Sequence, residues 1–390
     1  MKFVKTEDLK PGMRLAKPIY NKNGVLLYDR NSLLSAPGIA SVKNFGLFGI
    51  YILEPAEPAP PFSQEDLEFE QRQTIYMFKV REIFNQINQK GDIDNLPNLI
   101  KDIMRSYGSL DHRVNFNQNL RSADDFTYKH AISTAILIAL MTPHLNLAAL
   151  NQDALICAAL LYGFGYEFAP KSVLDKGQDL TAGDKDMIQQ SLEKGLIYLG
   201  TYRNEFAFFP KALRVMEYYI HSYYSNKPVN NTDPEVQTMA SILHVATTFD
   251  RSTAMSLGHE PESEIMAMKF MLDAPDQYSR PVVTALAKCI HICPTGASVD
   301  LSTGDKGIVL EENPEDFMYP LVLRLSDNQI YDLSRAAVRK DIEIIDIMKT
   351  MDNRVVIDEN TLKLFVADER IKATADKFRA HHRRTRGLDL

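Results

Sequence analysis

The sequence predicts a mainly α-helical protein, with a small β-rich N-terminal domain and a short β hairpin after the helical core. Three observations support this fold class. Alternating apolar residues and turn signals mark the first 54 residues, apolar residues recur at helical spacing from Ser63 to about Pro294, and short strand patterns follow Pro294. The 390 residues are enough for two or three domains.

Residues 1–54 are expected to form the small β-rich module. Val25–Tyr28 follows an Asn-Lys-Asn-Gly stretch that is typical of a hairpin turn. In chain order, the expected elements are a strand at 13–20, a turn at 21–24, a strand at 25–28, a helical pattern through 41–46 and a strand at 50–53.

Residues 55–63 contain four prolines, which predicts a stiff, extended linker and a domain boundary. Residues 64–108 are expected to form a helical connector. Ser63 followed by Gln-Glu-Asp is a good helix start, because acidic residues favour the first turn. Long helices outside a core often pair, so a homodimer is also an expectation.

Residues 109–297 are expected to form the helical domain. The segment 153–161 is apolar on all sides, which is typical of a buried core helix. The other expected helices, including the one that ends the connector, are at 97–107, 125–142, 183–200, 210–223, 233–255, 261–272 and 279–292.

After Pro294 the pattern changes to a β extension at 298–345. Strands are expected at 298–301, 307–310 and 319–325, with a hairpin turn at 302–305. A helical pattern begins near residue 341, and residues 346–390 are expected to form a helical tail with a basic end.

The composition favours a cytoplasmic protein. The N-terminus lacks the apolar core of a signal peptide, and the longest apolar stretches are too short to span a bilayer, which needs about 20 residues. A net charge of −7 argues against a protein that coats nucleic acid. The three cysteines do not suggest a disulfide framework.

The segment Leu160–Thr181, LLYGFGYEFAPKSVLDKGQDLT, resembles the HD-GYP family, whose members carry a pattern similar to LLHDIGKIGIPxxILxKPGxLT. Gly165 and Pro170 agree with that pattern without a gap. Tyr162 stands where the family has histidine, Gly163 where it has aspartate, and Tyr166 where it has lysine.

Other segments between residues 125 and 325 resemble the family in the same order. Two histidines match metal-ligand positions of the family, His130 and His221. Ser191 replaces a ligand histidine and Thr247 replaces a ligand aspartate, while Asp250 matches. The remaining matches are scaffold positions: Lys176, Gly195, the 290–296 exit and the 301–309 hairpin.

The resemblance implies an HD-domain-like helical bundle of bacterial origin. Active members hydrolyse the second messenger cyclic di-GMP at a cluster of two or three metal ions. Such a centre needs carboxylate and imidazole ligands, and neutral hydroxyls are poor ones. With two histidines left, we expect no cofactor, no catalytic residue and no metal, and a residual single ion is disfavoured.

The leading hypothesis is therefore a catalytically inactive signalling protein that binds a protein partner or cyclic di-GMP, with the protein partner favoured. Lys176 is the candidate ligand contact. One alternative is an active, metal-dependent cyclic di-GMP phosphodiesterase with a remodelled site. The other is an adaptor that binds nucleic acid or membrane through the basic tail around His381–Arg386.

Two further clusters have ordinary structural interpretations. Cys289 and Cys293 share a helix face, but His291 lies roughly opposite, so a buried helix end is favoured over a zinc site. The tyrosines and phenylalanines between 198 and 224 could stack on a base, although such clusters more often form core or a protein interface.

Overall fold

The structure is a computed structural model. It describes residues 2–20, 25–44, 49–53, 63–116, 118, 121, 125–145, 147–174, 176, 180–224, 233–254, 261–347, 373–374, 377–378 and 380. The predicted turn at 21–24, the end of the predicted helix at 45–46, the linker at 55–62 and the basic tail from His381 all lie outside these residues.

The N-terminal module is β-rich, as predicted. Its three-stranded antiparallel sheet has the order β1-β5-β2, beside a two-stranded ribbon of β3 and β4 and one helix. Strand β1 is an addition to the predicted elements. The elements are β1 Lys2–Lys5, η1 Thr6–Asp8, β2 Arg14–Leu15, β3 Ile19–Tyr20, β4 Leu26–Tyr28, α1 Ala36–Asn44 and β5 Gly49–Leu53.

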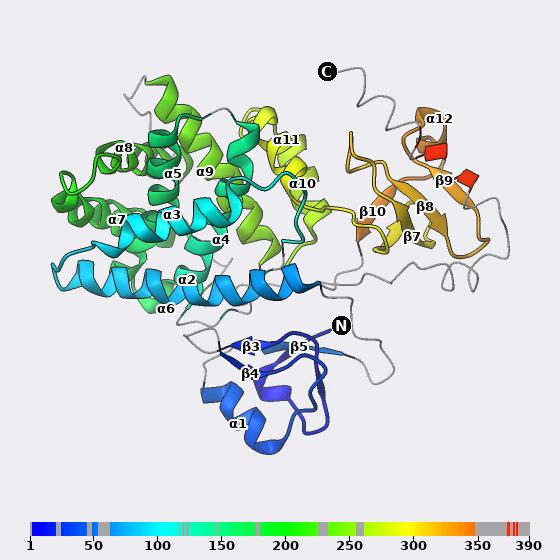
Figure 1. The fold of residues 1–390 in the computed structure, drawn as a ribbon, viewed down its shortest axis with the longest axis horizontal. Helices are drawn as coiled ribbons and strands as arrows, with labels where there is room; N and C mark the ends of the chain where they lie inside the picture. Colours follow the sequence, from blue (N-terminus) through cyan, green and yellow to red (C-terminus); the bar gives the residue numbers. More distant parts are fainter. Residues whose placement is uncertain are drawn as a thin grey trace.

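The helical domain is organised around α4, which packs against α2, α5, α9 and α11 (Figure 1). Both α4 and α5 are buried nearly all round, which confirms the predicted core helix. The elements are α2 Gln64–Asn88, α3 Asn95–Tyr107, α4 Phe126–Met141, η2 Thr142–His144, α5 Ala149–Leu161, η3 Tyr162–Phe168, α6 Lys171–Leu174, α7 Ala182–Leu199, η4 Gly200–Tyr202, α8 Phe209–Tyr219, η5 Ile220–Tyr224, α9 Pro234–Thr253, α10 Glu264–Asp273 and α11 Arg280–Cys289.

Side-chain caps explain where two of these helices begin. Ser63 accepts a hydrogen bond from the Asp66 amide, and Asp66 accepts one back from the Ser63 amide, a capping box that starts α2 as predicted. Thr181 and Asp184 form the same arrangement at α7. No helix in the described part of the chain is both long and apolar enough to cross a membrane.

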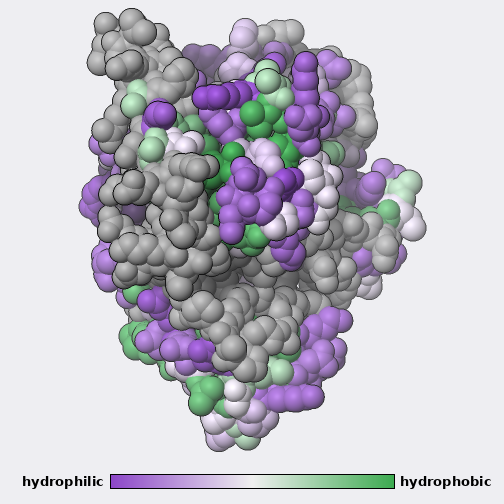
Figure 2. Space-filling model, turned by 90° about the vertical axis from the view of Figure 1, so that its right-hand side faces the viewer, coloured by the Kyte–Doolittle hydropathy of each residue, from purple (hydrophilic) through white to green (hydrophobic). Residues whose placement is uncertain are grey.

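The hairpin predicted after the core is present and belongs to a larger antiparallel sheet of order β10-β6-β7-β8-β9. The helical pattern predicted from residue 341 is wrong at Ile344–Ile347, because this segment pairs with β6 and buries Ile344 and Ile347. The elements are β6 Ser298–Leu301, β7 Lys306–Glu311, β8 Leu321–Arg324, β9 Ile330–Asp332, α12 Ala336–Arg339 and β10 Ile344–Ile347. The described surface on this side is largely hydrophilic (Figure 2).

A buried lysine attaches the N-terminal module to the helical domain. Lys17 is 2% exposed, and its Nζ lies 3.0 Å from Glu70 Oε1 on α2. The same ammonium group donates to the backbone oxygen of Gln118 at 2.9 Å. A buried ammonium group needs such partners, because an unpaired one would be strongly penalised. The module is therefore held against α2 and the segment before α4.

Two glycines let η3 approach α7 at backbone contact distance. A Cβ added at Gly165 would lie 2.4 Å from Leu192 Cα, and one at Gly195 would lie 2.6 Å from Gly165 Cα. Contacts this short cannot be accommodated without backbone movement. The two positions that agree with the family pattern therefore keep η3, which carries Tyr162 and Gly163, in place.

We expect Gly195→Ala to lower the free energy of unfolding by about 2–4 kcal/mol, since overpacking a tight backbone contact is costly. Gly183→Ala is the matched control in the same helix, where the added Cβ meets only a Thr181 oxygen at 3.9 Å. That change should be neutral or stabilising by up to about 1 kcal/mol. Urea denaturation of both variants is the measurement, and equal effects would contradict the packing argument.

Candidate functional site

The structure brings three of the sequence-predicted positions together at the centre of the helical domain. His130 on α4 contacts Tyr162 at the start of η3, and Thr247 on α9 is connected to them through Tyr219. The rings of Tyr162 and Tyr219 meet edge to face with centroids 5.3 Å apart. These residues therefore form one buried aromatic and hydroxyl-bearing cluster.

Asp250 on α9 lies at the centre of a buried hydrogen-bonded chain. Arg121 Nη2 is 2.6 Å from Asp250 Oδ1, and Arg121 Nη1 is 3.0 Å from Oδ2. His130 Nδ1 bonds the same Oδ2, while His130 Nε2 bonds the Tyr162 hydroxyl. None of these four side chains is more than 3% exposed. The chain Arg121–Asp250–His130–Tyr162 is hereafter the central tetrad.

The pKa directions fix the protons within the central tetrad. Burial alone would raise the pKa of Asp250, but the Arg121 guanidinium and the His130 ring hold it below its usual range, so Asp250 is a carboxylate. Burial lowers the pKa of His130 to about 4, only partly offset by Asp250, so the ring is neutral at pH 7. A carboxylate can only accept, and therefore His130 Nδ1 carries the proton.

The Nε2 lone pair of His130 then accepts from Tyr162. Burial raises the pKa of Tyr162 well above its usual value, so its hydroxyl keeps the proton that it donates. A histidine that ligates a metal typically donates one ring N–H to a carboxylate and offers the other nitrogen to the ion. In this site the second ring nitrogen is taken by the Tyr162 hydroxyl.

The central tetrad does not fit a dinuclear metal centre. Both Asp250 oxygens bond Arg121, and both nitrogens of His130 are occupied. Within the described ranges, no group of three or more His, Cys, Asp or Glu residues could hold a metal ion. A single neutral imidazole and tyrosine hydroxyls are weak ligands for the hard cations that cleave phosphodiesters.

The other predicted positions are separate from the central tetrad. Ser191 on α7 donates to the Met187 carbonyl at 2.8 Å. His221 Nε2 in η5 lies 3.4 Å from Glu193 Oε1. A Cβ at Gly163 would meet Thr127 Cγ2 at 3.3 Å, so an aspartate there would be crowded.

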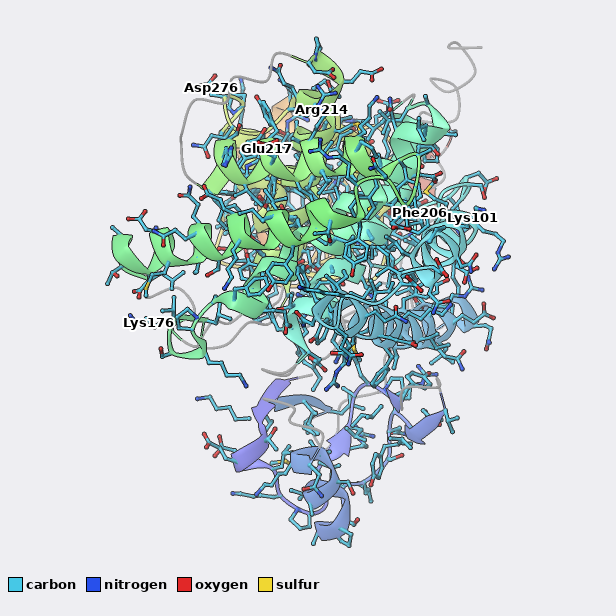
Figure 3. The ribbon with its side chains drawn as sticks, turned by 90° about the vertical axis from the view of Figure 1, so that its left-hand side faces the viewer. Lys101, Lys176, Phe206, Arg214, Glu217 and Asp276 are labelled. Atoms are coloured by element: carbon cyan, nitrogen blue, oxygen red, sulfur yellow. The ribbon has the colours of Figure 1, made fainter. Side chains whose placement is uncertain are left out.

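Lys176 is paired on the domain surface. Its Nζ lies 2.8 Å from both oxygens of Asp184, and Figure 3 shows it at the edge of the helical domain. The bond from Lys176, together with those from Thr181, lowers the pKa of Asp184 to about 2. This lysine therefore supports the capping box of α7, and its role as a ligand contact stays a prediction.

The cysteine pair and the aromatic cluster both have structural surroundings. Cys289 and Cys293 are buried thiols, and burial raises the pKa of both, while His291 Nδ1 pairs with Glu312 at 2.8 Å. The aromatic residues between 198 and 224 pack against or within the main hydrophobic core, which confirms the core interpretation.

A second guanidinium lies beside the central tetrad. Arg251 Nη2 donates to the Tyr166 hydroxyl at 2.5 Å and to the Tyr224 hydroxyl, and the guanidinium lies 5.2 Å from the centre of the Tyr224 ring. The two hydroxyls are 2.7 Å apart. Burial raises the pKa of both tyrosines, so they are neutral partners of this cation.

Sequence reasoning missed the polar residues that complete the site. Arg121 and Gln118 lie before α4, outside any helix or strand, where no periodicity indicates a buried role. Gln118 Oε1 accepts from Arg121 at 2.9 Å, and its Nε2 donates to Thr253 Oγ1 at 2.8 Å. Arg251 directly follows the matched Asp250 in sequence, and that adjacency is the one signal that could have found it.

We expect Tyr162→Phe to lower the free energy of unfolding by about 1–3 kcal/mol, because His130 Nε2 would lose its donor while buried. Tyr107→Phe is the matched control: the Tyr107 hydroxyl is equally buried and has no hydrogen-bond partner in the described structure. Its removal should be neutral or stabilising. Thermal and urea denaturation test the pair, and a neutral Tyr162→Phe would exclude the assigned bond.

The stability of the protein should also depend on pH through His130. A histidine pKa of about 6.5 in the unfolded chain and about 4 in the folded protein means that folding releases protons between these values. The neutral His130 ring therefore contributes at most about 3 kcal/mol to the free energy of unfolding. This contribution is fully present above pH 6.5 and is lost as the pH falls toward 4. His130→Gln should flatten this part of the curve, whereas an unchanged slope would contradict the neutral ring.

Comparison with known proteins is consistent with this geometry. The HD domain family matches residues 115–280, the range that contains the central tetrad. A cyclic di-GMP phosphodiesterase of Pseudomonas aeruginosa, PA4108, is 22% identical over 233 residues, covering 58% of this chain and 53% of that protein. The chain thus spans about half the length of this curated relative, and no solved structure is a significant match. Residues 115–280 are therefore similar to the HD domain family, and part of the chain is distantly similar to a cyclic di-GMP phosphodiesterase.

Proposed function

We propose that this protein is a degenerate HD-GYP-type member of cyclic di-GMP signalling that acts by binding and does not hydrolyse the nucleotide. The observation that carries the proposal is the occupation of His130. Its two ring nitrogens are bonded to Asp250 and Tyr162, so the ring has no lone pair left for a metal ion.

The charge of the site supports the same proposal. In a metal-dependent hydrolase, bound cations neutralise carboxylates and polarise phosphoryl oxygens. Here Arg121 neutralises Asp250 through two bonds of 2.6 and 3.0 Å. A guanidinium held in this way stabilises the fold, but it cannot act as a base toward water, because it has only N–H donors and no acceptor.

Two modes of binding follow from the sequence, a protein partner or cyclic di-GMP. The sequence alone favours the partner. The structure adds one observation in favour of a ligand, since the half-buried Arg251 bonds only neutral hydroxyls among the described residues. The alternative of a remodelled hydrolase requires His130 to release Tyr162 and bind metal instead.

The full chain, purified without a tag, should contain less than about a tenth of a metal ion per molecule. It should leave cyclic di-GMP uncleaved when Mn²⁺ or Fe²⁺ is added. Metal analysis and chromatographic assay of the nucleotide are the measurements, and calorimetric titration with cyclic di-GMP then separates the two binding modes.

Variants of two histidines distinguish a true activity from contamination. His130→Ala removes the ring at the centre of the site, and His144→Ala removes an exposed ring in η2, just after α4, as a control. Cleavage that is lost in the first variant and kept in the second would overturn the proposal. Cleavage that is equal in both variants belongs to a contaminant and leaves the expected result intact.

A further inference from the structure

The two arginines of the site differ in how their charge is balanced. Arg121 faces the Asp250 carboxylate directly and is fully compensated. Arg251 has no carboxylate within salt-bridge distance in the described part of the chain, and its polar partners are the hydroxyls of Tyr166 and Tyr224. A largely buried cation without an anion is unfavourable unless something else supplies the charge.

Hydrogen bonds show which donors of Arg251 remain. Both tyrosine bonds are made by Nη2, so Nη1 and Nε donate to no described protein group. These two nitrogens lie on different edges of the planar guanidinium, and each can donate a charge-assisted hydrogen bond to an oxygen of a phosphate or carboxylate. Arg251 is partly exposed, so the residue is in contact with solvent.

The tyrosines hold the guanidinium in a fixed orientation. The Tyr166 and Tyr224 hydroxyls lie 2.7 Å apart, and the Arg251 guanidinium stacks over the Tyr224 ring at 5.2 Å. On the inner side, Tyr219 packs edge to face against Tyr224 and bonds Thr247 at 2.9 Å. A cation held in place in this way loses little side-chain entropy when it binds an anion.

We propose that Arg251, held by Tyr166 and Tyr224, is an anion-recognition residue that binds a phosphate group, either as free phosphate or as part of a nucleotide. The proposal rests on the proposed function only in that the ligand is bound and not cleaved. The aromatic surroundings favour a phosphate that is attached to a planar ring, since tyrosine faces offer stacking surface beside the cation.

The test uses the full chain with inorganic pyrophosphate and guanosine 5′-monophosphate as probes, at matched ionic strength. Calorimetry and thermal melting should show binding of at least one probe to the wild type. Arg251→Gln should weaken that binding at least tenfold. Arg251→Lys keeps the charge but not the planar group that the two tyrosines hold in place, and should weaken it at least fivefold, which decides the question where the glutamine variant does not fold.

A second basic surface provides the matched control. His144, Arg280 and Lys288 line a shallow pocket beside α11, with no acidic residue among its lining. The double variant Arg280→Gln with Lys288→Gln should bind both probes like the wild type. Unchanged binding in the Arg251 variants, loss of binding in the α11 variant, or no binding by the wild type would each overturn the proposal.

The probes also separate this proposal from the proposed function. Neither probe contains the cyclic phosphodiester, so their binding does not depend on whether the protein hydrolyses cyclic di-GMP. Tighter binding of the nucleotide than of pyrophosphate would indicate that the ring contributes, and equal or weaker binding would assign the site to free phosphate.

Discussion

The bidentate ion pair between Arg121 and Asp250 is the interaction on which the rest of the site depends. It fixes the carboxylate that orients His130, and His130 in turn fixes Tyr162 at the start of η3. Both charges are essentially inaccessible to water, so removal of either partner would leave an uncompensated buried ion at a cost of about 3–5 kcal/mol. The pair is thus a structural constraint that fixes how α9, α4 and η3 lie relative to one another.

The same ion pair connects the site to the N-terminal module. Gln118 bonds Arg121 through its side chain, and its backbone oxygen accepts from Lys17 of the module. Lys17 is balanced by Glu70 on α2 at 3.0 Å. Because each of these polar groups is buried, moving the module would leave at least one of them unpaired. The position of the module and the positions of Gln118 and Arg121 are therefore coupled.

The sequence allowed the helical fold to be predicted, because periodic apolar residues decide which faces are buried. The sequence also indicated the hairpin of β6 and β7, because the turn residues at 302–305 lie directly between the two strands. Strand β10 reads as helix in the sequence because Ile344 and Ile347 are spaced like a helix face, and only pairing with β6 shows that they belong to a sheet. Arg121 could not be predicted for a similar reason: its partner Asp250 lies 129 residues away, and no local pattern reports such a contact.

The site residues that were predicted correctly as neighbours came from a resemblance, and their chemistry came only from coordinates. That His130 matches a ligand position of the family did not reveal which groups would take its two ring nitrogens. The two arginines of the site also differ in a way that only the coordinates show. Arg121 supplies the positive charge that balances the buried Asp250 carboxylate. Arg251 adds a second positive charge, which no described side chain balances. A cation supplied by the protein itself can therefore make such a site attractive to anions, as a bound metal ion would.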